Sequence, residues 1–250
     1  MSIVTGQTQP EEQTLLEVVV LHPRDAAAAT DGGADRLLFL VGPEDVGRSP
    51  DPAAVSAVVR ETSLPVRVLL RVEDGYAASA EGLRRLAGLA GDLRQLGADS
   101  FSFGFLDHDL EIDRAACAAL ATEVGTAWGF HRGFDAALEP GRAWRDVVTL
   151  PGIDAVASAG SSRGMAMGGD ELTAYASALP EVARLVLASG GLVPDQVPWL
   201  VRAGVRQFGI GASARQDGSW TKAYVDPGRV RAWRMLLDDA LSRALGIPVD

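Results

Sequence analysis

The chain has 250 residues, of which 47% are hydrophobic and 22% charged, a balance that is ordinary for a globular protein with a sizeable core. Its formal net charge of −10 argues against nucleic acid and anionic membranes as partners, because both require clustered Lys and Arg. A single cysteine excludes a disulfide within the chain and a cysteine-rich metal cluster.

The beginning of the chain, MSIVTGQTQPEEQ, is polar and acidic and lacks the layout of a secretory signal. No apolar run in the sequence approaches the length that a membrane-spanning helix needs. We therefore expect a cytoplasmic protein in which residues 1–14 form a flexible tail and residues 15–250 form one domain.

Eight short apolar segments are the predicted strands. Four of them come directly after a turn that contains Gly33, Gly97, Gly152 or Gly204, and glycine suits the left-handed position that ends a helix. In chain order, the predicted strands are 15–21, 37–41, 66–70, 100–105, 126–130, 155–157, 182–188 and 207–210.

The segments between these strands have the periodicity of helices. Leucines recur at helical spacing through 81–96, and Asp113 and Asp195 are placed to cap two later helices. The other predicted helices are 113–124, 195–203 and 228–245.

This strict alternation of strands and helices predicts an α/β protein with a parallel sheet. Eight such units fit a single closed (β/α)₈ barrel, the TIM barrel, of about this length. A doubly wound open sheet is the rival, but it usually carries a glycine-rich nucleotide-binding turn after its first strand. Residues 21–25, Leu-His-Pro-Arg-Asp, contain no glycine, so the sequence favours the eight-stranded barrel.

Polar side chains gather at the predicted C-terminal ends of the strands, where such barrels place their active sites. Glu17 lies in an otherwise apolar strand, a costly position unless it is paired, and we expect Arg71 or Arg132 to pair with it. His131, Arg132 and Asp135 follow the fifth strand, and a histidine titrates near neutral pH. We predict that these five residues are catalytic; the alternative for His131 is a structural role that holds Arg132 or Asp135.

Glycine-rich turns follow the last strands. In many barrels, turns after strands seven and eight bind phosphate through backbone N–H groups, although glycines also relieve crowding at tight turns. The predicted ligand-binding residues, which include the serine at the end of the sixth strand, are Ser158, Ser189, Gly190, Gly191, Gly211 and Ser213.

Other reactive side chains receive no site assignment. Lys222 is the only lysine and follows the eighth strand beyond the barrel mouth, so we do not expect Schiff-base chemistry. Met165 and Met167, in the loop after the sixth strand, are two thioethers of the kind that bind Cu(I), but two incidental loop methionines are the commoner case. We expect Cys117 to be a small core residue on its helix. No metal ligand is assigned.

Several short motifs of the chain occur in the same order and with the same spacing as in one protein family. The most specific is Phe130-His-Arg-Gly-Phe-Asp135. It is accompanied by Gly33-Ala-Asp-Arg36, Leu64-Pro-Val66 leading to Arg71, Leu96-Gly-Ala-Asp99, Glu111-Ile-Asp113, Ser158-Ala-Gly160, Gly190-Gly191, Ala203-Gly-Val205, Ala212-Ser213 and Tyr224-Val-Asp226. From Leu15 onward the chain resembles the CutC copper homeostasis family, and the resemblance implies a cytoplasmic (β/α)₈ barrel, often a homodimer, associated with copper handling.

The chain departs from that family where copper would be bound. The two cysteines that the resemblance implicates as Cu(I) ligands are here Val19 and Leu40, and the family's histidine before the final Ala-Ser is Gly211. The family's Arg-Pro-Arg-Gly-Gly after the third strand becomes Arg71-Val-Glu-Asp-Gly75.

Three functions follow, and the sequence leaves open whether the chain is an enzyme. The resemblance implies a copper homeostasis protein with copper as its ligand, which would have to use His131, His22 or the two methionines. The alternative is a lyase or isomerase without a Schiff base, in which Arg71 and Arg132 orient a small phosphorylated or carboxylated metabolite and His131 and Glu17 exchange protons. A degenerate barrel that serves as an interaction scaffold is the third reading.

Overall fold

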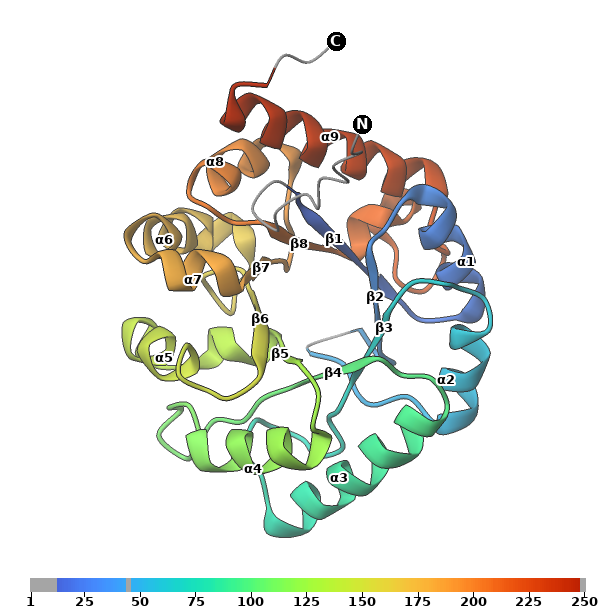
Figure 1. The fold of residues 1–250 in the computed structure, drawn as a ribbon, viewed down its shortest axis with the longest axis vertical. Helices are drawn as coiled ribbons and strands as arrows, with labels where there is room; N and C mark the ends of the chain where they lie inside the picture. Colours follow the sequence, from blue (N-terminus) through green and yellow to red (C-terminus); the bar gives the residue numbers. More distant parts are fainter. Residues whose placement is uncertain (1–12, 44–45, 248–250) are drawn as a thin grey trace, which may run out of the picture.

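The computed structural model describes residues 13–43 and 46–247. Eight parallel strands follow one another around a closed barrel, and β8 pairs with β1 to complete it (Figure 1). The strands are β1 (Leu15–Val20), β2 (Arg36–Phe39), β3 (Val66–Leu69), β4 (Ser100–Phe103), β5 (Trp128–Phe130), β6 (Ile153–Ser158), β7 (Val186–Ala188) and β8 (Gln207–Ile210). The predicted (β/α)₈ barrel is confirmed.

Helices form an outer ring around the strands (Figure 1). They are α1 (Pro23–Gly32), α2 (Pro52–Val59), α3 (Ala80–Gln95), α4 (Arg114–Val124), α5 (Pro140–Val147), α6 (Met165–Ala178), α7 (Pro180–Leu185), α8 (Val197–Arg202) and α9 (Pro227–Leu245). Over the described ranges, no helix is both long enough and apolar enough to cross a membrane.

The alternation of side chains along each strand separates an apolar outer layer from a partly polar interior. Val18 and Phe101 belong to the core beneath the helices, whereas Glu17, Arg67 and Ser102 line the inside of the barrel. The strands therefore bury both faces, and the inward-facing positions are the ones that build the site.

The glycine turns that precede four of the strands adopt the left-handed conformation expected of them. The φ angles are 88° at Gly33, 99° at Gly97, 73° at Gly152 and 93° at Gly204. Other residues would be strained there, which is why these glycines could mark strand starts in the sequence.

The predicted caps had different outcomes. Asp113 accepts a hydrogen bond from the Ala116 N–H at 2.9 Å and caps α4 as expected. The prediction that Asp195 caps a helix was wrong. Asp195 lies within the short 3₁₀ turn η3 (Pro194–Gln196), and α8 begins only at Val197.

The seventh strand is shorter than predicted. Residues 182–188 divide into the end of α7 and the three-residue strand β7. Pro180 occupies the first turn of α7, where its fixed φ favours a helix, so the apolar run beginning at Val182 continues as helix before it becomes strand.

A buried ion pair joins the segment after β8 to the first turn of α1. Arg215 Nη2 donates to Asp25 Oδ2 at 2.6 Å, and both side chains are 1% exposed. Asp25 Oδ1 also accepts from the Val225 N–H at 2.8 Å. Burial lowers the pKa of Arg215, and Asp25 opposes that shift. This pair holds the C-terminal segment, including α9, beside α1.

Of the predicted tail, residues 1–12 lie outside the described residues. Thr14 is buried, and its carbonyl oxygen accepts a hydrogen bond from Arg234 Nη1 of α9 at 3.1 Å.

Candidate functional site

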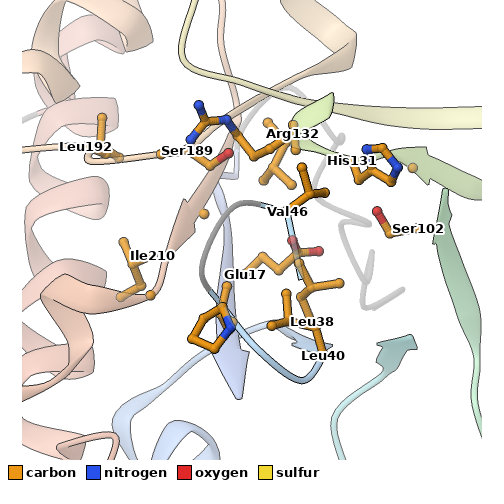
Figure 2. Close-up of a pocket in the computed structure, with 18 of the residues that line it drawn as sticks. Glu17, Leu38, Leu40, Val46, Ser102, His131, Arg132, Ser189, Leu192 and Ile210 are labelled. Atoms are coloured by element: carbon orange, nitrogen blue, oxygen red, sulfur yellow. The ribbon is translucent and has the colours of Figure 1, made fainter. Parts of the chain in front are cut away.

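The barrel opens at the C-terminal ends of its strands into a cavity of about 530 Å³. Polar side chains reach this cavity at two depths. Glu17 and Arg67 lie on the strands at its floor, whereas His131, Arg132 and Ser189 lie just beyond the strand ends at its rim (Figure 2). The wall between is largely apolar and includes Val19, Leu38, Leu40, Leu69, Leu187, Leu192 and Ile210.

At the floor, Glu17 is 2% exposed and pairs with Arg36, whose Nε donates to Glu17 Oε2 at 2.6 Å. The prediction that Arg71 or Arg132 would pair with Glu17 was therefore wrong. The register of β1 and β2 sets Glu17 directly beside Arg36, whereas the other two arginines lie beyond the ends of their strands.

Arg67 is the second buried cation of the floor. Its guanidinium extends from β3 to Asp154 of β6, where Nη2 donates to the two carboxylate oxygens at 2.7 and 2.6 Å. On the way it passes Gly129 of β5, where a β-carbon would lie 2.5 Å from Arg67 Nη1. Arg67 is 2% exposed, and burial lowers its pKa, as does Arg36, while Asp154 opposes that shift.

One donor of Arg67 is left over. Nε donates to Ser100 Oγ at 3.0 Å, but buried Nη1 has no hydrogen-bond partner in the part of the chain that the structure describes. Buried guanidinium N–H groups normally find an acceptor.

His131 lies at the rim and is 5% exposed. Its Nδ1 accepts a hydrogen bond from the Gly133 N–H at 3.0 Å, so the neutral imidazole carries its proton on Nε2. The bond also caps the short 3₁₀ turn η2 (Arg132–Ala136). His131 therefore combines a structural hydrogen bond at Nδ1 with an N–H donor at Nε2.

The Asp135 side chain does not line the cavity and forms an ion pair with Arg132 at the rim. Its side chain is 2% exposed and accepts from Arg132 Nε at 2.9 Å, Ser158 Oγ at 2.6 Å and the Ala159 N–H at 2.9 Å. Burial raises the pKa of Asp135, and Arg132, Ser158 and Ala159 oppose that shift. Neither Asp135 nor Ser158 is among the residues that line the cavity, so the structure places both as supports of Arg132.

The turn after β7 meets Arg132. Gly190 and Gly191 have φ angles of 84° and 93°, and a β-carbon at Gly190 would overlap Arg132 Nη1. Figure 2 shows the Arg132 side chain extending toward Ser189. Ser189 Oγ is buried and has no hydrogen-bond partner within the described ranges. The fold thus brings together Arg132, Ser189, Gly190 and Gly191 from two separate predictions.

The turn after β8 also reaches the cavity, through Gly211 and Ser213. The ring of Trp220 covers Gly211, where a β-carbon would collide with it, and the Arg215 guanidinium lies 4.8 Å from the ring centroid. Trp220 is therefore part of the cavity wall, a place that the scattered tryptophans of the sequence did not reveal.

Arg71 lies apart from the other predicted catalytic residues. Its guanidinium donates to the carbonyl oxygens of Gly47 at 2.8 Å and Gly75 at 3.3 Å. It lines a separate small cavity of about 20 Å³, which His131 also borders, and not the large one.

None of the sulfur groups that the structure describes lines the cavity. Cys117 is fully buried in α4, and burial raises the pKa of its thiol to about 12. Met165 and Met167 belong to the first turn of α6 rather than to a loop; Met165 is 1% exposed and Met167 59% exposed. The described residues that line the cavity therefore offer oxygen and nitrogen donors, whereas Cu(I) prefers thiolate and thioether sulfur.

The remaining candidates lie at the surface. His22 is exposed at the beginning of α1, and its ring is 5.6 Å from that of Tyr224. Lys222 is exposed and does not line the cavity, as the sequence predicted.

The sequence did not single out Arg67 at the floor or the two residues Arg36 and Asp154, which pair with Glu17 and Arg67. The available signal was a charged residue inside or next to an apolar strand, the same signal that singled out Glu17. That signal does not reveal which charges pair.

A family comparison matches residues 14–213 to the CutC family. A CutC family protein of Xylella fastidiosa is 32% identical over 203 residues, which cover 80% of this chain and 74% of that protein. A human copper homeostasis protein cutC homolog is 30% identical over 162 residues, covering 63% of this chain and 58% of that protein.

Solved structures agree on the fold. The CutC crystal structure from Streptococcus agalactiae has a TM-score of 0.68 at 21% identity and covers 80% of this chain and 98% of that one. N-(5'-phosphoribosyl)anthranilate isomerase from Pyrococcus furiosus has a TM-score of 0.60 at 12% identity, covering 91% and 100%, and shows the barrel alone. With most of its length matched by the family model and by these relatives, the chain belongs to the CutC family.

Proposed function

We propose that this chain is a barrel enzyme that binds a small carboxylated or phosphorylated metabolite in the cavity and acts on it by proton transfer. The proposal rests on the rim of the cavity, where Arg132 contacts the Ser189–Gly191 turn. The Ser189 hydroxyl there is buried without a partner among the described residues. Arginine donors bind planar oxyanions well, and a hydroxyl adds a further donor to the same group.

The size and polarity of the cavity support a small organic ligand. A volume of about 530 Å³ falls within the usual range for small-molecule sites, and most of the lining is apolar. Arg132 and Arg67 already face Asp135 and Asp154, so the local charges nearly balance. This balance favours a ligand with compact acidic groups over a polyphosphate, since added negative charge gains little net attraction.

Proton transfer is the chemistry that fits the titratable groups at the cavity. His131 presents an imidazole at the rim, and the Glu17 carboxylate lies on the floor, fixed by Arg36. Lys222 lies outside the cavity, so the reaction proceeds without a lysine Schiff base. A lyase or isomerase meets these conditions if the Glu17 carboxylate exchanges the proton and His131 donates its Nε2–H to the oxygen that gains negative charge.

A thermal-shift screen of small carboxylic acids and phosphate monoesters tests binding. Ligands that bind the native state raise the melting temperature. Arg132→Gln and Ser189→Ala should abolish the shift, and Arg202→Gln, which changes an exposed arginine on α8 outside the cavity, should preserve it. For any acid that binds, His131→Ala, which removes the Nε2–H donor, should retain binding and lose turnover. Absence of any shift in the wild type, or equal shifts in all variants, would overturn the proposal.

A second candidate is direct Cu(I) binding, which the name of the human relative suggests for this chain. The donor set of the cavity argues against it, because its described lining contains no sulfur ligand. Anaerobic Cu(I) titration against a competing chelator separates the two candidates. Affinity weaker than micromolar favours the metabolite, and tighter binding that persists in a Cys117→Ser variant would favour copper at the cavity.

A further inference from the structure

We propose that Arg67 is a second ligand-binding group at the floor of the cavity, and that the ligand is a bifunctional acid. One acidic group binds at the rim, to Arg132 and Ser189, and a carboxylate or carbonyl oxygen at the other end accepts a hydrogen bond from Arg67 Nη1. This inference rests on the proposed function and names its substrate class.

The hydrogen bonds of Arg67 leave one direction open. Nη2 and Nε are engaged by Asp154 and Ser100, whereas Nη1 is buried at Gly129 without a partner among the described residues. Glycine at this position brings in backbone but no side chain that could supply an acceptor. An unmet buried N–H is unfavourable, so a ligand oxygen that accepts from Nη1 would gain a hydrogen bond that the described residues do not supply.

The floor carries the Arg67 donor beside a carboxylate. Glu17 also lines it, and Arg36 Nε donates to Glu17 Oε2 at 2.6 Å, which compensates the negative charge of Glu17. Ser102, which is 4% exposed, adds a hydroxyl to the lining. A ligand oxygen therefore matches the Arg67 side of the floor.

The two ends are separated by an apolar stretch. Arg67 Nη1 lies beside Gly129, and Arg132 follows Gly129 by three positions, which is about 10 Å of extended backbone. Leu38, Leu69 and Leu187 line the cavity between floor and rim. The polar ends and apolar middle of the cavity therefore match a carbon chain that carries an oxyanion at one end and a carboxylate or carbonyl group at the other.

Two matched pairs of acids test the inference by calorimetry: hexanoate with adipate, and butyrate with succinate. Within each pair the chain length is equal, and only the terminal methyl is replaced by a carboxylate. In at least one pair the diacid should bind the wild type about tenfold or more tightly than the monoacid, as one charge-assisted hydrogen bond gives. Arg67→Lys, which keeps the charge and loses the planar fork, should remove this preference.

Arg215→Lys is the control, because Arg215 is also a buried, paired arginine but does not line the cavity. It should keep the diacid preference, and circular dichroism of each variant checks folding. Equal binding of diacid and monoacid in both pairs by the wild type overturns the inference without using any variant. So does a preference that survives in Arg67→Lys.

The outcomes separate this inference from the proposed function. If no acid of either pair binds while another member of the thermal-shift panel does, the bifunctional acid is overturned and the proposed function stands. If no anion of the panel binds at all, both fail.

Discussion

Replacing Gly129 with alanine tests the arrangement at the cavity floor. The new β-carbon would lie 2.5 Å from Arg67 Nη1, whereas ordinary van der Waals contacts begin at 3.4 Å. Backbone on one side and the buried guanidinium on the other leave little room, so Arg67 has to withdraw by about 1 Å. That movement acts on a side chain that is 2% exposed and whose Nη2 is paired with Asp154.

The size of the effect follows from what Arg67 loses. Its bonds to Asp154, now 2.7 and 2.6 Å, would stretch to about 3.6 Å, beyond hydrogen-bonding distance. Losing a charge-assisted hydrogen bond costs about 1.5–3 kcal/mol, and overpacking alone costs about 1–3 kcal/mol. Because the two effects partly replace each other, we expect Gly129→Ala to lower the unfolding free energy by about 3 kcal/mol.

Urea denaturation followed by circular dichroism and tryptophan fluorescence measures this change. In a chain of this size the melting temperature should fall by about 6–12 °C. Gly88→Ala is the matched control, because Gly88 lies in the middle of α3 with nothing within 4 Å of a new β-carbon. It should stabilise the helix by about 0.5–1 kcal/mol. A Gly129→Ala protein within about 1 kcal/mol of the wild type would refute the described path of Arg67.

Three further predictions concern buried groups elsewhere. Arg215→Met should lower the unfolding free energy by about 3–5 kcal/mol, because it leaves the buried Asp25 carboxylate without its cation. Amide hydrogen exchange at Val225, whose N–H donates to Asp25, should accelerate. Unchanged exchange would contradict the role of this ion pair in holding the C-terminal segment. Cys117 should react with a thiol reagent at neutral pH only when urea unfolds the chain, because the thiol is buried and its pKa is raised to about 12; rapid labelling of the native protein would contradict its place in the core. The pKa of Asp135 is raised above its ordinary 3.8, so the native state keeps the proton of the Asp135 carboxyl to higher pH than the unfolded chain does. The contribution of Asp135 to stability therefore falls as pH rises from about 3.8. Urea titrations across pH should therefore show the wild type losing stability relative to Asp135→Asn as pH rises, and a difference that stays constant or grows would contradict this sign.

Local signals predicted most of the fold. Leucine periodicity predicted α3, Asp113 predicted the start of α4, and glycines with a left-handed backbone marked four strand starts. Each depends on neighbours within a few residues, so the sequence carries it directly. The seventh strand was extended too far because a short apolar run, interrupted only by Arg184, shows no clear period to tell helix from strand.

The candidate site divides in the same way. The string from Phe130 to Asp135 was recognisable in the sequence, but only the fold separates its members: His131 and Arg132 line the cavity, and Asp135 stands behind Arg132 as a support. Ser158 donates to Asp135 and does not line the cavity, and its predicted ligand binding stays a prediction.

By itself the sequence determined the barrel, its family resemblance, the absence of the expected copper thiols and the unusual position of Glu17. Only the tertiary structure decided that Glu17 pairs with Arg36, that Arg67 passes Gly129 to reach Asp154, and that Arg132 meets Ser189. The physical reason is range. Strand and helix signals lie within a few residues of one another, whereas the contacts of the cavity join residues far apart in the chain through strand register and side-chain reach, which no local pattern encodes.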